Sequence, residues 1–355
     1  METTRVERAV SLTAPTATPE SFALETADGY TLKGFRWRQV GSSSATRPVV
    51  IINPATSVCC RYYFRFAVFL FKHGFDVIAY DYRGIGESRP AALRGFDACW
   101  LDWGCLDFEA VLRHAEQSFS GQPINVVAHS VGGFVLGLAQ SNHLIHRVFT
   151  MGAQYAYWRD YAVGARLRMV AKWHLAMPLI TLLFGYFPGK KLGWLEDTPK
   201  GVVRDWACGR ECFEDTWRGR STARYPDQHA LVQQFAAVTA PTLAVSVTDD
   251  QFGTVPAVER LLAYFSHSPR THIRISPQSI FEPAIGHFGF FNSRFEQKLW
   301  QIPLQWLKSG RLPAGVPGVL IRRGQRSGSD TQEPTPPVPE TPSLRLNASK
   351  CMQDR

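Results

Sequence analysis

The chain has 355 residues, 45% of them hydrophobic, enough to bury the core of one large α/β domain with an insertion or of two smaller domains. Its formal net charge is +9, but no nucleic-acid-binding motif accompanies the basic residues, so we expect no nucleic-acid partner. The seven cysteines are scattered and odd in number, which argues against a disulfide framework and predicts a reduced, cytoplasmic protein.

The ends of the chain and its most apolar stretch bear on targeting. Residues 1–20 are rich in Thr, Ala and Pro, lack the apolar core of a secretory signal, and are predicted to be disordered. The longest apolar stretch, 175–187, is shorter than the roughly 18–20 residues of a spanning helix. Pro178 and Gly185 also interrupt it, so the sequence predicts a soluble protein.

Strand and helix patterns alternate along most of the chain. A strand–turn–strand unit covers 21–38, with Asp28-Gly29 at its turn. The expected buried strands are 49–52, 75–80, 124–128, 148–151, 242–247 and 271–275, and the expected helices are 62–73, 103–119, 132–140, 255–265 and 294–307. This order predicts an α/β fold with a mostly parallel, doubly wound sheet.

The alternation stops in one long segment and again near the end. Residues 154–235 contain no comparable strand pattern and are predicted to form an inserted helical cap. The core is then formed by 21–153 together with 236–309. Residues 310–355 are rich in Pro, Ser, Thr and Arg, and we expect them to form a disordered tail.

The strongest chemical signal is the turn around Ser130. A buried strand ends at Ala128, and a helix-compatible run begins just after Ser130, with Gly132 two positions beyond the serine. This strand–turn–helix context, with small residues two before and two after the serine, is typical of a nucleophile elbow. The alternative is a tight connection in which the serine only caps the helix.

A nucleophilic serine needs a base to take its proton and an acid to orient that base. His287 lies between glycines and beside aromatic residues in the loop after the last predicted strand. The strand at 242–247 runs into Asp249-Asp250. We expect Asp250 to be the acid because it lies further past the strand end; Asp249 is the alternative, and the other aspartate would shape the turn.

A tetrahedral oxyanion needs two N–H donors. Val131, directly after the serine, supplies one at a helix N-terminus, where N–H groups have no intrahelical partner. The second is expected from the loop after the strand at 49–52. Pro54 has no N–H, so the sequence leaves Ala55 and Thr56 as candidates.

Several of these motifs together resemble a known family. Residues 21–308 resemble the α/β-hydrolase superfamily, most closely a bacterial group of predicted hydrolases related to its serine aminopeptidase and lysophospholipase-like branch. The motifs that carry the resemblance are Asn53–Thr56, Asp81–Ser88, His129–Gly133, Asp249-Asp250 and Ile285–Phe291. The resemblance implies a Ser-His-Asp hydrolase without metal or organic cofactor, but no particular substrate. Ala128 replaces the usual first glycine of the elbow, a sterically mild departure.

No motif identifies the substrate, so its chemical class is inferred from the inserted segment. Its apolar stretch at 169–194 is interpreted either as a cap helix packed on the core or as a lid that lines an acyl pocket. In the second interpretation, Arg166, Arg168, Lys172, Lys190 and Lys191 face lipid head groups in a peripheral membrane contact. We therefore expect a small-molecule acyl substrate, an ester with an apolar acyl group.

The same triad also serves amidases, peptidases, thioesterases and acyltransferases, and a non-catalytic binding protein could retain the fold. The sequence does not indicate an oligomeric state.

Overall fold

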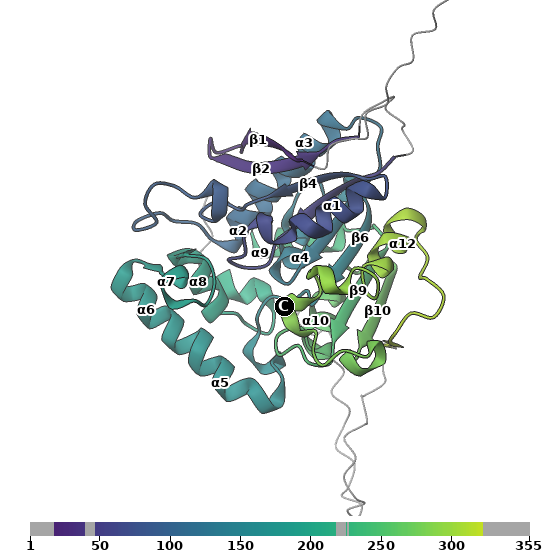
Figure 1. Cartoon of the computed structure of the whole chain (residues 1–355). Coiled ribbons are helices and arrows are strands. Elements are labelled where there is room, and N and C mark those ends of the chain that lie inside the picture. Colours follow the sequence, from purple (N-terminus) through teal and green to yellow (C-terminus); the bar gives the residue numbers. More distant parts are fainter. Residues whose placement is uncertain (1–17, 40–46, 218–224, 226, 322–355) are drawn as a thin grey trace, which may run out of the picture.

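The computed structural model of the chain describes residues 18–39, 47–217, 225 and 227–321. A nine-stranded sheet in the order β1-β2-β4-β3-β5-β6-β9-β10-β11 forms its centre, with helices on both faces (Figure 1). The strands are β1 (Glu20–Glu25), β2 (Thr31–Trp37), β3 (Val49–Asn53), β4 (Asp76–Tyr80), β5 (Ile124–His129), β6 (Ile145–Met151), β9 (Thr242–Val247), β10 (Arg270–Ile275) and β11 (Val319–Leu320). The five pairings from β4 to β10 are parallel, which confirms the predicted fold class.

Helices connect these strands and cover the sheet. They are α1 (Phe64–Lys72), α2 (Trp100–Asp102), α3 (Glu109–Ser118), α4 (Val131–Leu138), α5 (Arg166–Val170), α6 (Met177–Phe184), α7 (Gly189–Leu192), α8 (Lys200–Ala207), α9 (Gln228–Ala236), α10 (Val255–Tyr264), α11 (Gly286–Gly289) and α12 (Gln301–Ser309). The last helix begins seven residues later than the predicted Arg294. Pro303 lacks an N–H and is accommodated because it lies in the first turn of α12.

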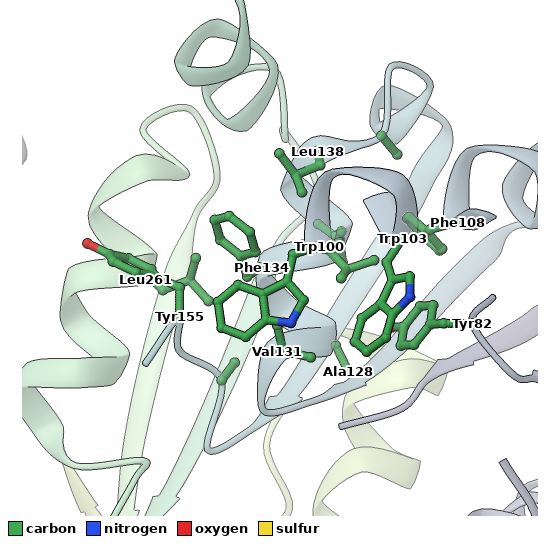
Figure 2. Close-up of a cluster of buried hydrophobic side chains, with 14 of the residues drawn as sticks. Tyr82, Trp100, Trp103, Phe108, Ala128, Val131, Phe134, Leu138, Tyr155 and Leu261 are labelled. Atoms are coloured by element: carbon green, nitrogen blue, oxygen red, sulfur yellow. The ribbon is translucent and has the colours of Figure 1, made fainter. Parts of the chain in front are cut away.

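Two apolar cores lie on opposite faces of the sheet. β3 and β5 are buried throughout, so alternate residues of each strand face opposite cores. Helices α1 and α12 cover one face, and α3, α4 and α10 cover the other (Figure 1). Figure 2 shows the second core around α4, where Trp100 packs on Phe134 with ring centroids 5.9 Å apart, close to Val131. These layers fix the carboxyl end of β5, from which α4 begins.

The chain leaves the main sheet between β6 and β9. This part contains α5 to α9 and a small antiparallel pair, β7 (Tyr186–Phe187) with β8 (Thr198–Pro199). Its last helix packs on the core: Phe235 of α9 contacts Phe134 of α4, with ring centroids 5.2 Å apart. The part is helical, as expected, whereas its boundaries as a separate cap remain a prediction.

The helix at Val163–Phe184 is longer than the sequence pattern indicates. It runs through α5, a π-helical turn at Ala171–Ala176 and α6. Pro178 does not break it because the proline falls in the first turn after the π-helical turn. Among the described residues it is the one helix that is long and apolar enough, by length and composition alone, to cross a membrane. Only 22% of its most apolar window is buried inside the fold.

The predicted disorder at the two ends falls largely outside the described residues, which exclude 1–17 and 322–355. The tail prediction differs from the structure at its start. There Val319–Leu320 forms β11 and pairs antiparallel with Ile273 and Arg274 of β10. Two residues of pairing are enough to extend the sheet edge beyond residue 310.

Candidate active site

Ser130 occupies a sharp turn between β5 and α4. Its backbone has φ 54° and ψ −122°, a conformation that is costly for a residue with a Cβ. Hydrogen bonds hold it there: the Ser130 N–H donates to the Met151 carbonyl at 3.0 Å, and the Ser130 carbonyl accepts from the Gly133 N–H at 3.1 Å. A methyl group at Gly132 would lie 2.5 Å from the Asn53 carbonyl oxygen, which explains the small residue predicted there.

The structure brings His287 and Asp250 together. The Nδ1 atom of His287 lies 2.7 Å from Oδ2 of Asp250. The other carboxylate oxygen of Asp250 accepts from the N–H groups of Phe252 and Gly253 at 2.8 and 2.9 Å. Burial alone would raise the pKa of Asp250, but the His287 ring and these two donors outweigh it and hold that pKa below its usual value. The carboxylate therefore stays charged beside the ring.

Asp249 has a different set of partners. Its Oδ2 accepts from the N–H groups of Ile285 and Gly286 at 2.8 and 2.9 Å. The side chain therefore holds the backbone just before His287 and does not contact the ring. Of the two aspartates left open by the sequence, Asp250 is the one whose side chain contacts the His287 ring.

Gly152 lies directly against this pair. Its φ is +56°, and a methyl group there would lie 2.8 Å from Asp250 Oδ2 and 3.2 Å from His287 Nδ1. We expect Gly152→Ala to lower the free energy of unfolding by about 2–3 kcal/mol and kcat by at least about tenfold, because it combines backbone strain with displacement of the pair. Denaturant unfolding measures the first effect, and a steady-state assay of catalysis measures the second.

Gly74→Ala is the matched control for Gly152→Ala. Gly74 also has positive φ, at +93°, but a methyl group there would meet no heavy atom of the described residues within 4 Å. We expect this variant to lose only the backbone cost, about 1–2 kcal/mol, with kcat unchanged. Equal kcat in the two variants would contradict the importance of the Gly152 contact.

Ser130 and His287 line the same narrow cavity. Apart from the serine and histidine, the lining residues are all uncharged, and several are aromatic. They are Ala55, Thr56, Trp100, Val131, Gln154, Ala156, Trp206, Phe252 and Phe288. The cavity is thus lined by residues of the core, of the loop after β3 and, with Trp206 of α8, of the inserted segment. No Asp, Glu, Lys or Arg lines it among the described residues.

The two candidate donors in the loop after β3 are not equivalent. The Ala55 N–H already donates to the Tyr63 hydroxyl oxygen at 2.9 Å. The Thr56 N–H has no hydrogen-bond acceptor within the described ranges. Val131 is the first residue of α4, so its N–H has no intrahelical partner. The geometry therefore favours Val131 with Thr56 over Val131 with Ala55 as the pair that could hold an oxyanion.

A buried line of hydrogen bonds connects that loop to the backbone of His287. Tyr63 Oη lies 2.7 Å from His129 Nδ1, and His129 Nε2 lies 2.9 Å from the His287 carbonyl oxygen. A carbonyl can only accept, so Nε2 carries the proton, and the Tyr63 hydroxyl donates to Nδ1. Burial lowers the pKa of His129 to about 3, so its ring stays neutral. These bonds give the His129 ring a specific structural role between Tyr63 and the His287 backbone.

This buried neutral ring predicts an acid-sensitive fold. The unfolded chain protonates His129 near pH 6.5, whereas the folded chain does so only near pH 3, so stability is lost as pH falls through that window. We expect wild type to lose about 2 kcal/mol more unfolding free energy than His129→Gln between pH 7 and pH 5. Urea titrations at both pH values measure the unfolding free energy of each protein. An equal loss of unfolding free energy in wild type and His129→Gln would contradict the prediction.

Gln154 is a site residue that the sequence analysis missed. It follows β6, and its side-chain Nε2 lies 3.4 Å from Ser130 Oγ. Its Oε1 accepts from the Ala156 N–H, which fixes which end of the amide faces the serine. The available signal was its position just past the carboxyl end of a strand next to β5, where site residues gather in parallel sheets.

Comparisons with known proteins agree with this fold. The family model described as serine aminopeptidase, S33, matches residues 44–277, ending before His287. The chain is similar in structure to the esterase Pf2001 of Pyrococcus furiosus, at 17% identity and a TM-score of 0.52, over 86% of this chain and 98% of that one. It is also similar to DcsB, solved with a substrate analogue, at 14% identity and a TM-score of 0.53, over 82% and 99% of the two chains. No curated protein matches its sequence significantly.

Proposed function

This chain belongs to the serine aminopeptidase S33 family of α/β-hydrolases and is therefore a hydrolytic enzyme, and we propose that it cleaves carboxylic esters with an apolar acyl group. In this proposal Ser130 is the nucleophile, His287 the base and Asp250 the acid. The observation that carries the ester assignment is the uncharged lining of the cavity at Ser130, which includes the aromatic side chains of Trp100, Trp206, Phe252 and Phe288.

The proposed mechanism uses the contacts at the site. Ser130 Oγ attacks the ester carbonyl carbon while His287 takes its proton, and Asp250 stabilises the resulting imidazolium through Nδ1. The N–H groups of Val131 and Thr56 bind the oxyanion. When the C–O bond breaks, His287 returns the proton to the leaving alcohol. Water, deprotonated by His287, then hydrolyses the acyl-enzyme and restores Ser130.

The cavity also bears on the peptidase alternative. An aminopeptidase has to bind a protonated amine, and a buried ammonium needs a carboxylate partner to offset its desolvation. Within the described residues, no carboxylate lines the cavity, and Asp250 is already bonded to His287, Phe252 and Gly253. Trp100, Trp206 and Phe252 instead suit an apolar acyl group.

A substrate panel tests the proposal. We expect kcat/KM to rise by at least about tenfold from p-nitrophenyl acetate to p-nitrophenyl butyrate, because added methylenes are buried in an apolar pocket. Leucine p-nitroanilide is the matched amine-bearing substrate and should be cleaved much more slowly. A higher kcat/KM for the anilide than for every ester would overturn the ester assignment in favour of a peptidase.

A further inference from the structure

The helix at Val163–Phe184 has apolar side chains on both of its faces. Met169, Trp173 and Met177 point into the fold and are buried. Yet Leu167 is 88% exposed, and Leu182 is 71% exposed, on the opposite side. The large apolar residues exposed along this helix are Val163, Leu167, Leu175, Leu179, Leu182, Leu183 and Phe184. A helix that is apolar all round is normally buried on every side, so this outer face calls for a partner.

Basic residues predominate around this outer face. Between Tyr161 and Leu195 the sequence has five basic residues, Arg166, Arg168, Lys172, Lys190 and Lys191, and no acidic residue. In the described part of the chain, Lys190 is the one member of this set in an ion pair, with Glu196 at 2.7 Å. Positive charge beside an exposed apolar face complements an anionic lipid surface, where head groups meet acyl chains.

The way the helix is held determines how it could meet a bilayer. Trp173 stacks on Trp206 of α8, with ring centroids 4.9 Å apart and an angle of 18° between their planes. In Figure 1, α5 and α6 run along the lower left edge of the molecule, on the side away from the sheet. A helix packed along one side in this way can lie in the plane of a membrane surface without leaving the fold.

We propose that the outer face of Val163–Phe184 docks this enzyme onto anionic membranes. Leu175, Leu179 and Leu182 enter the acyl-chain boundary while the basic residues contact lipid phosphates. Trp206 and Phe252, which contact Trp173, also line the cavity, and Phe252 lies 4.9 Å from His287 between ring centroids. Docking thus places the Ser130 cavity one layer of side chains behind the bound helix. This orientation favours lipid-dissolved esters as substrates, a point that rests on the proposed function, whereas the docking does not.

Vesicle sedimentation tests the docking with the full chain. We expect binding to phosphatidylcholine vesicles containing about 25% phosphatidylglycerol to be at least about tenfold tighter than to phosphatidylcholine alone, and to weaken with salt. The triple variant Leu175→Gln, Leu179→Gln, Leu182→Gln should bind about a hundredfold more weakly, because three apolar side chains no longer leave water. The double variant Arg168→Gln, Lys191→Gln should lose most of the preference for anionic lipid.

The matched control is Val319→Gln with Leu320→Gln, which changes exposed apolar residues on β11. It should bind vesicles as wild type does. The triple variant should keep the wild-type melting temperature and hydrolyse soluble p-nitrophenyl butyrate within about twofold of wild type, since its leucines are exposed and none of them lines the cavity.

Two results would overturn the docking. One is equal vesicle binding by wild type and the triple variant. The other is a wild-type dimer, seen by light scattering, that the triple variant dissociates while neither protein binds vesicles, which would assign the face to a second copy. Failure of the proposed function is a separate result: vesicle binding with no hydrolysis of any ester leaves the docking intact.

Discussion

Ser130→Ala is expected to lower kcat for p-nitrophenyl butyrate by about 10⁵-fold and to abolish labelling by a fluorophosphonate probe. Without Oγ there is no atom to form the acyl-enzyme, and His287 has no serine proton to take. The fold should tolerate the change, because alanine adopts the backbone conformation of Ser130 no less readily than serine does. We expect the melting temperature to shift by less than about 2 °C.

His287→Ala provides the matched comparison for this prediction. It removes the proposed base but keeps Oγ, so labelling should slow sharply instead of being abolished. Wild-type protein that is folded but never labelled would indicate a non-catalytic binding protein on this fold. Labelling retained in Ser130→Ala would place the nucleophile on another residue.

The second large effect is expected at Asp250. Its Oδ1 accepts from the N–H groups of Phe252 and Gly253, and its Oδ2 faces His287 Nδ1. In Asp250→Asn the single carbonyl oxygen stays with the two N–H donors, so the amide NH₂ faces Nδ1 as a donor. The ring must then carry its proton on Nε2 and cannot take the serine proton. We expect kcat to fall by about 10³–10⁴-fold.

Asp249→Asn is the matched control, with the same chemical change one residue earlier. Both hydrogen bonds of Asp249 end on one oxygen, Oδ2, and an amide oxygen can accept the same two bonds from Ile285 and Gly286. We therefore expect a loss in kcat of less than about tenfold. A larger loss in Asp249→Asn than in Asp250→Asn, at equal folded fractions by circular dichroism, would exchange the roles of the two residues.

The parallel sheet could be predicted from sequence because its strands are continuous apolar runs. β3 and β5 are buried on both faces, and their patterns needed no information from elsewhere in the chain. The helix at Val163–Phe184 shows the limit of this reasoning. Apolar residues on both faces satisfy any packing pattern, so periodicity could not indicate which face of that helix is exposed.

Part of the candidate site could likewise be predicted from the sequence, and part could not. Ser130, His287 and the aspartate pair could be proposed from motif and chain order, because tight turns at strand ends constrain residue type locally. The sequence could not choose between Ala55 and Thr56 as the second proposed oxyanion donor. The choice depends on the hydrogen bond from the Ala55 N–H to Tyr63, a contact that only the folded α1 region creates. Gln154 was missed for the same reason: it carries no motif, and only the pairing of β5 with β6 brings it to Ser130.

The hydrogen-bonded line from Ala55 through Tyr63 and His129 to the His287 backbone bears on how this site can evolve. It couples the position of the loop at Ala55 to the position of the His287 backbone. Neither loop can therefore move without disturbing the other. Selection for new substrates should therefore leave Tyr63 and His129 untouched and alter the cavity wall at Trp206. Libraries that vary both kinds of position together should yield mostly inactive proteins, even where every chain folds.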